Sequence, residues 1–225
     1  MPSAPSDPLP SACFGSGQPS LPVIAHLSRQ PAIQKVPSAK LTLFLKRHFL
    51  KPDLCAALMD RIDAERRPST LSDPNGDAKY RTSETCDIAF DDPLGMTVNS
   101  AICDLMGLDP AFGEPLQGQR YAVGQEFKLH TDYFDPLGID YEKYCSVAGQ
   151  RTWTAMIYLN EPVAGGATRF KAINKIVQPE TGKLLMWDNR GLDGSINAST
   201  LHQGMPVRAG TKYILTKWFR EGRWG

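Results

Sequence analysis

Two histidines and one carboxylate in the C-terminal half of the chain have types and spacing that suit a metal site. His130 and Asp132 stand two positions apart in KLHTDYF, and because side chains on a strand alternate between its faces, both can point to one side. The other histidines are His26, His48 and His202, and His202 is the natural third ligand because LHQGMPV places it just before a late strand. Two histidines and one carboxylate form the facial triad of non-haem Fe(II) oxygenases, which leaves room for a bidentate keto acid and O₂. Zinc accepts the same ligands, so the triad alone leaves the metal open.

Lys212 favours iron with a dicarboxylate cosubstrate. It follows His202 by ten residues, in TKYILTKWF, where Lys212, Ile214, Thr216 and Trp218 share one face of a strand. If that face points into a barrel, a buried ammonium is costly unless it meets an anion. The far carboxylate of 2-oxoglutarate would be that anion. An edge-strand lysine that points to solvent is the alternative interpretation.

Short runs rich in β-branched and aromatic residues fill the half of the chain that holds these residues. Gly, Pro and Asn separate the runs, which is typical of strands joined by turns. The predicted strands are 116–123, 126–131, 151–159, 167–171, 174–178, 182–188, 206–209 and 211–219. Eight short strands predict a mainly β (α+β) fold of the jelly-roll, or double-stranded β-helix, type.

The first half of the chain should support this barrel with helices. Residues 41–50 are predicted as a buried strand, and Pro52 then opens a helix in PDLCAALMDRIDAERR. Residues 93–108 show a second helical pattern. Between them, residues 69–80 carry an Asp-Pro-Asn-Gly turn signal and should form a flexible flap.

Residues 1–38 differ in composition from the rest of the chain. They are rich in Pro, Ser and Gly, so we expect neither a helix nor a central strand there, but a tail or an arm lying on the domain. The predicted domain then spans residues 39–225.

Charge and cysteine usage exclude several classes of protein. The formal net charge is +1, from 25 basic and 24 acidic residues, which gives no cationic field for nucleic acid. The 5 cysteines are odd in number and form no C-x-x-C pair, which argues against a disulfide framework and a thiolate zinc site. No apolar run approaches the ~18 residues that span a bilayer, and the N-terminus lacks a signal-peptide pattern. We expect a soluble, cytoplasmic protein that binds neither nucleic acid nor membrane.

The combined motifs resemble the prolyl 4-hydroxylase branch of the Fe(II)/2-oxoglutarate dioxygenases over residues 41–222. The segments that carry the resemblance are YRTSETC (80–86), RYAVGQEFKLHTDYF (120–134), RTWTAMIYLN (151–160), GGATRF (165–170) and LHQGMPVRAGTKYILTKWFRE (201–221). An H-x-D pair, a distal histidine and a lysine ten residues further on are far more specific together than any one of them is alone.

The resemblance implies roles for particular residues. It makes His130, Asp132 and His202 the catalytic iron ligands, and it makes Lys212 the partner of the 2-oxoglutarate C5 carboxylate. It adds Tyr121 and Thr168 as hydroxyl donors to that carboxylate, since charge-assisted bonds suit a buried anion. It places Arg151, Trp218 and Glu114 on the substrate side of the iron. Without the family, Tyr121 would be a strand aromatic, Thr168 a residue after a Gly-Gly turn, Arg151 a solvent-facing strand start and Trp218 a core residue.

The chain departs from the family pattern at one position beside the iron. Relatives often have a tyrosine three residues before the first iron histidine, whereas Phe127 stands here, so any contact through that hydroxyl is missing. Halogenating relatives replace the iron carboxylate by a small residue, and Asp132 therefore favours hydroxylation. Residues 133–150 should form a long loop whose aromatic side chains shape a lid.

The predicted function is therefore hydroxylation of an unactivated C–H bond with Fe(II), 2-oxoglutarate and O₂, and by resemblance with ascorbate as a further candidate cofactor. The predicted substrate is a prolyl residue in a peptide or protein, over which residues 69–80 and 133–150 would close. A free amino acid or another small metabolite is the enzymatic alternative. The non-enzymatic alternative is an inert β-barrel binding module, and a zinc hydrolase lacks a placed general base.

Overall fold

The computed structural model describes residues 20–69, 80–139 and 141–225. The expected flap at 69–80 falls almost wholly outside these residues, as does the first half of the expected tail. In the described part, no helix combines the length and the apolar character that crossing a membrane requires.

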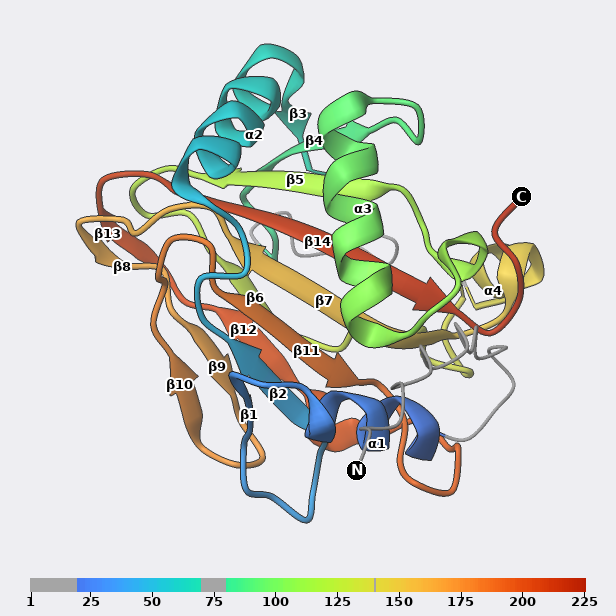
Figure 1. Cartoon of the computed structure of the whole chain (residues 1–225). Helices are drawn as coiled ribbons and strands as arrows, with labels where there is room; N and C mark the ends of the chain where they lie inside the picture. The colour runs from blue at the N-terminus through green and yellow to red at the C-terminus, as the bar shows by residue number, and fades with distance from the viewer. Residues whose placement is uncertain (1–19, 70–79, 140) are drawn as a thin grey trace, which may run out of the picture.

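An antiparallel sheet of eight strands forms the larger layer of the fold (Figure 1). Its strand order is β1-β2-β11-β7-β14-β5-β4-β3, so that strands far apart in the sequence lie side by side. The strands are β1 (Ile33–Lys35), β2 (Leu43–Lys46), β3 (Arg67–Pro68), β4 (Glu84–Ile88), β5 (Leu116–Tyr121), β7 (Arg151–Tyr158), β11 (Leu184–Asp188) and β14 (Lys212–Arg220).

A smaller antiparallel sheet faces the larger one and completes the barrel (Figure 1). Its order is β10-β9-β12-β6, and a separate two-stranded ribbon pairs β13 with β8. The strands are β6 (Phe127–His130), β8 (Ala164–Gly165), β9 (Thr168–Phe170), β10 (Lys175–Val177), β12 (His202–Gly204) and β13 (Val207–Ala209). Side chains of both sheets share one apolar core, in which Phe170 and Val177 meet Leu185 and Trp187. This arrangement is the predicted double-stranded β-helix.

Helices cover the outer face of the large sheet (Figure 1). They are α1 (Leu21–Arg29), α2 (Pro52–Glu65) and α3 (Pro93–Met106), and together with β7 and β14 they enclose the second apolar core. The predicted helices at Pro52 and at 93–108 are confirmed. The Asp92 side chain accepts a hydrogen bond from the Gly95 N–H and so caps α3, which ends at Gly107 in the left-handed conformation (φ 68°).

The structure corrects the expectation for residues 1–38. Residues 21–29 form α1, in which Pro22 occupies the first turn and Val23 and Leu27 are buried in the helix–sheet core. A proline in the first turn is tolerated because its missing N–H would have no partner there. The expectation that this stretch holds no helix is therefore wrong, and the division of the chain at residue 38 stays a prediction.

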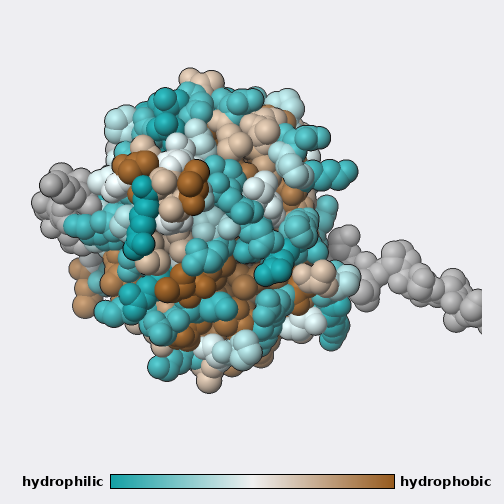
Figure 2. All heavy atoms as spheres, turned by 90° about the vertical axis from the view of Figure 1, so that its left-hand side faces the viewer, coloured by the Kyte–Doolittle hydropathy of each residue, from teal (hydrophilic) through white to brown (hydrophobic). Residues whose placement is uncertain are grey.

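The expected loop at 133–150 also contains regular structure. Helix α4 (Tyr141–Ala148) occupies its second half, and two 3₁₀ turns, η1 (Pro110–Phe112) and η2 (Ala198–Thr200), lie elsewhere in the chain. The predicted strands from 116 to 219 are all present, and β12 is an additional strand that begins at His202 itself. The surface at the end of the molecule where β8, β10 and β13 lie is mixed: hydrophilic side chains cover most of it, and apolar ones gather in a band below its middle (Figure 2).

Candidate metal and cosubstrate site

The two strands β6 and β12 bring the three predicted ligands together. The strands pair antiparallel with His202 opposite His130, and Asp132 follows the end of β6 by two residues. The ligand atoms of His130, Asp132 and His202 all lie within 4.8 Å of one another. Among the described residues, this is the one group of three or more His, Cys, Asp or Glu side chains with metal-binding geometry. Residues up to 72 positions apart in the sequence (202 − 130) thus form one potential metal centre.

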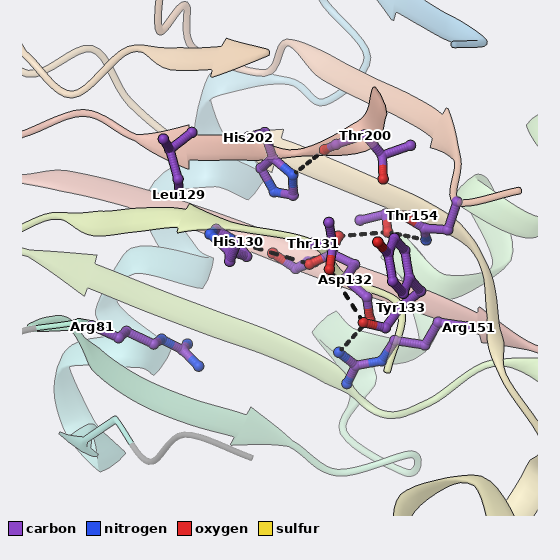
Figure 3. A network of polar contacts seen from close by, with 12 residues as sticks. Arg81, Leu129, His130, Thr131, Asp132, Tyr133, Arg151, Thr154, Thr200 and His202 are labelled. Atoms are coloured by element: carbon purple, nitrogen blue, oxygen red, sulfur yellow. Dashed lines mark hydrogen bonds and ion pairs between the residues drawn. The ribbon is translucent and has the colours of Figure 1, made fainter. Parts of the chain in front are cut away.

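Backbone carbonyls fix both imidazole rings in one orientation (Figure 3). The His130 Nδ1 lies 2.7 Å from the Lys128 carbonyl oxygen, and the His202 Nδ1 lies 2.9 Å from the Thr200 carbonyl oxygen. A carbonyl accepts only, so each Nδ1 carries the proton and each Nε2 keeps a lone pair for a metal.

The charge states of the ligands also suit a divalent cation. Burial and the neighbouring His202 lower the pKa of His130 to about 3, so its ring is neutral. Burial alone would raise the pKa of Asp132. The adjacent His202 and His130 rings, the positive charge of Arg151 and a hydrogen bond from Thr154 outweigh burial, and the pKa of Asp132 lies below its ordinary value. Two imidazoles and one carboxylate are the donor set that Fe(II) takes in facial triads.

A narrow inner cavity of about 30 Å³ runs from the ligands toward Lys212. Lys212 is 1% exposed, and among the described residues no carboxylate pairs with it. Burial lowers its pKa to about 7. Ile214, Thr216 and Trp218 line the same cavity, so the strand face predicted to point into the barrel does so.

Tyr121 and Thr168 also line the inner cavity, as expected. The Tyr158 hydroxyl lies 2.6 Å from Thr168 Oγ1 and 3.1 Å from the Val177 carbonyl oxygen, so its single proton can be donated to only one of the two. The Tyr121 hydroxyl donates to Gln119 Oε1 over 2.7 Å, so it must turn away from Gln119 to serve the same anion. The cavity therefore offers one ammonium and hydroxyl groups to a carboxylate.

A larger outer cavity of about 210 Å³ meets the inner one at the ligands. His130, Asp132, Phe127 and Trp218 line both cavities. The Arg151 guanidinium carbon lies 4.0 Å from the centre of a Trp218 ring, and both side chains line the outer cavity; their role toward a substrate stays a prediction. Its other lining residues include Arg81, Tyr133, Phe134 and Tyr144.

The structure places Glu114 behind this wall. Glu114 is not among the residues that line either cavity, and its carboxylate accepts from Arg151 Nε over 2.6 Å and from Arg220 Nη1 over 3.0 Å. Glu114 therefore holds Arg151 in place and lies out of reach of a substrate in the cavity.

The sequence alone indicates neither a role for Arg81 nor the stacking of Phe127 on a ligand. Arg81 lies in the quoted segment YRTSETC, and its guanidinium hydrogen-bonds Ser83, Thr85 and Gln117 and covers the Phe127 ring. The Phe127 and His130 rings stack with centres 3.4 Å apart, so an apolar ring lies where relatives often have a tyrosine. The position of Arg81 within a quoted motif is the one sequence signal for its role, and motif spacing alone does not show that its side chain reaches the cavity.

Comparisons with known proteins agree with this site. The family model described as the 2OG-Fe(II) oxygenase superfamily matches residues 116–220, which hold the three ligands and Lys212. Prolyl 4-hydroxylase subunit alpha-1 of Bos taurus is 33% identical over 160 residues, which cover 69% of this chain and 30% of that protein. The chain thus spans less than a third of the length of this relative.

Solved structures share the fold. The 2OG complex of the viral collagen prolyl hydroxylase vCPH from Paramecium Bursaria Chlorella virus-1 matches with a TM-score of 0.60 and 22% identity, over 86% of this chain and 98% of that one. A Trichoplax adhaerens prolyl hydroxylase, solved with a hypoxia inducible factor peptide fragment, matches with a TM-score of 0.61 and 16% identity, over 90% of this chain and 89% of that one. The chain therefore carries a domain of the 2OG-Fe(II) oxygenase superfamily and is similar to the prolyl 4-hydroxylases.

Proposed function

We propose that this protein is an Fe(II)- and 2-oxoglutarate-dependent dioxygenase that hydroxylates a prolyl residue in a peptide or protein. One observation carries the proposal: His130, Asp132 and His202 converge at one end of a buried cavity whose other end holds the Lys212 ammonium without an anionic partner among the described residues. A metal ion at one end and a cation at the other fit a keto acid that also bears a distant carboxylate.

Bound Fe(II) would supply the oxidising chemistry, in which O₂ and 2-oxoglutarate yield succinate, CO₂ and a hydroxylated substrate. The protein's own residues bind and orient the reactants. His130 and His202 offer Nε2 lone pairs, and Asp132 offers a negative charge. Lys212 and Thr168 bind the far carboxylate of the cosubstrate, and the buried lining excludes water from the inner cavity.

The outer cavity supports a peptide substrate. It is larger than the inner cavity, and Arg151, Trp218, Tyr133 and Phe134 offer it both flat aromatic surface and hydrogen-bond donors. Similarity to prolyl 4-hydroxylases, together with the shared fold of a prolyl hydroxylase that was solved with a peptide, points the same way. We propose that Arg151 and Trp218 position the chain that carries the target proline. The resemblance to prolyl 4-hydroxylases further supports a dependence on ascorbate. The odd number of scattered cysteines supports a location in the cytoplasm.

Turnover by the purified protein tests the proposal. Fe(II), 2-oxoglutarate and a panel of proline-containing peptides should yield succinate and a gain of one oxygen on a peptide, measured by NMR and mass spectrometry. His202→Ala should abolish both products because it removes a metal ligand. If free amino acids gained oxygen and the peptides did not, the substrate would be a small metabolite and the peptide hypothesis would be wrong. Succinate formation that His202→Ala leaves unchanged would contradict the metal centre, and a protein without any turnover would fit an inert binding module.

A further inference from the structure

The two carboxylate oxygens of Asp132 have different surroundings. Oδ2 accepts a hydrogen bond of 2.7 Å from the Thr154 hydroxyl, and Oδ1 lies 3.9 Å from His130 Nε2 (Figure 3). Oδ1 is therefore the oxygen that faces the other ligands, and Oδ2 is already engaged by the protein.

Asn189 sets the direction of the Thr154 hydrogen bond. Its Nδ2 donates to Thr154 Oγ1 over 3.0 Å. A hydroxyl has one proton, and because its oxygen accepts from Asn189, the proton is available to Asp132. If the Asn189 amide were reversed, Asn189 Oδ1 and Asp132 Oδ2 would compete for the single Thr154 proton. Donation to Asn189 would then leave Asp132 Oδ2 facing a lone pair of the Thr154 oxygen.

Backbone hydrogen bonds within and beside the large sheet fix the positions of Thr154 and Asn189. Thr154 lies on β7 and is paired with Trp187 of β11, and the Asn189 N–H donates to the Thr152 carbonyl oxygen over 2.7 Å. Thr154 and Asn189 are each 0% exposed, so bulk water does not compete for their hydrogen bonds. The two buried hydrogen bonds, from Asn189 Nδ2 to Thr154 and from Thr154 to Asp132, restrict the rotation of both Thr154 and Asp132, whereas Asn189 Oδ1 has no hydrogen-bond partner among the described residues.

We propose that Thr154 and Asn189 are positioning residues that hold Asp132 as a one-oxygen ligand of the metal; this inference rests on the proposed function. A carboxylate that is free to rotate could bind the ion through both oxygens and take a coordination position that the keto acid or O₂ needs. Engaging Oδ2 with a donor prevents this rotation. The same bond favours the charged carboxylate, because a hydrogen bond to the anion is stronger than one to the acid.

Metal affinity, measured on the full chain with Mn(II) alone, tests the proposal without any turnover. Thr154→Val keeps the side-chain shape and removes the proton donor, and it should weaken Mn(II) binding by about 10–100-fold. Thr154→Ser restores the hydroxyl and should recover most of the affinity. Co(II) absorption, which reports coordination geometry, should change for Thr154→Val and return for Thr154→Ser.

Thr152→Val is the matched control. Thr152 lies two residues earlier on the same strand and is 3% exposed, but its hydroxyl donates to the Phe219 carbonyl oxygen over 3.2 Å. Its loss should cost stability without changing the Mn(II) dissociation constant. Should Thr154→Val not fold, Asn189→Ala provides the second variant, since it frees the hydroxyl to turn and should weaken Mn(II) binding to a smaller extent.

The outcomes separate the two proposals. An unchanged dissociation constant for Thr154→Val or for Asn189→Ala, or a loss no larger than that of Thr152→Val, would overturn the positioning role alone. A parent protein that binds no Mn(II) would overturn the metal centre and the positioning role together.

Discussion

The Lys212 ammonium should make cosubstrate binding depend on pH. Its pKa in the free protein is lowered to about 7 by burial, and a bound carboxylate would raise it because an opposite charge favours the protonated form. Binding is then strongest below about pH 7 and is lost as the pH rises through that value, by about tenfold per pH unit until the pKa of the bound state is reached. Calorimetric titration of 2-oxoglutarate into the Mn(II)-loaded protein, between about pH 6 and pH 9, measures this slope.

Lys212→Arg is the control for this pH dependence. An arginine stays protonated throughout the range, so the dissociation constant should no longer change with the state of residue 212. A slope that survives in Lys212→Arg would show that another group titrates.

We expect Glu114 to contribute to the stability of the fold and not to contact the substrate directly. Its carboxylate is the ion-pair partner of both Arg151 and Arg220, and it is 8% exposed. Removing one member of a buried ion pair leaves an uncompensated charge, so Glu114→Ala should lower the free energy of unfolding by about 3–5 kcal/mol. Urea denaturation checks this value. A loss below about 1 kcal/mol would contradict it, since that is the range of exposed ion pairs.

For individual residues, the sequence predicts the positions that strand alternation and motif spacing determine. A period of two places His130 and Asp132 on one shared face, and the metal and cosubstrate motifs indicate that this face and the face of Lys212 point inward. Glu114, Thr154 and Asn189 could not be placed, because their roles depend on which strands become neighbours in the sheet. The register that sets Trp187 opposite Thr154 is a property of the fold that no local pattern contains.

Helix α1 should contribute to the core although it lies in a proline-rich stretch. Leu27 is 0% exposed and packs in the helix–sheet core. Leu27→Ala should therefore lower the free energy of unfolding by about 2–5 kcal/mol, through lost burial and the cavity that remains. Leu21→Ala in the same helix is the control, because Leu21 is 53% exposed and should change stability by no more than about 0.5 kcal/mol. Equal effects of the two substitutions would show that α1 does not pack as described.

Elements with weak or misleading patterns are the ones that the sequence did not predict. In α1, Pro22 reads as a helix breaker unless it is recognised as a first-turn residue, and the apolar pair Val23 and Leu27 is short. In β12 the three residues are His, Gln and Gly, none of which is β-branched or a large apolar residue, so the composition gives no strand signal. The longer strands β5, β7, β11 and β14 and the helices α2 and α3 carried periodic patterns or clear caps, and these were predicted correctly.

The metal and cosubstrate site lies between the two sheets of the molecule. His130 and His202 belong to the small sheet, whereas Thr154 and Lys212 belong to the large one. A metal ion would join β6 to β12, and Thr154 would connect that centre to β7. Binding energy at the site therefore stabilises the packing of one sheet on the other.

Metal binding should in consequence raise the melting temperature. A ligand that binds only the native state, at a hundred times its dissociation constant, adds about 2.7 kcal/mol. For a chain of this length this corresponds to a rise of about 5–10 °C, measured by calorimetry with Mn(II) and after its removal with EDTA. His202→Ala should abolish the rise because it takes away a ligand from the small sheet. His48→Ala, at an exposed histidine outside the site, should keep it. If both variants kept the full rise, the ion would be binding elsewhere, and the link between metal and sheet packing would fail with it.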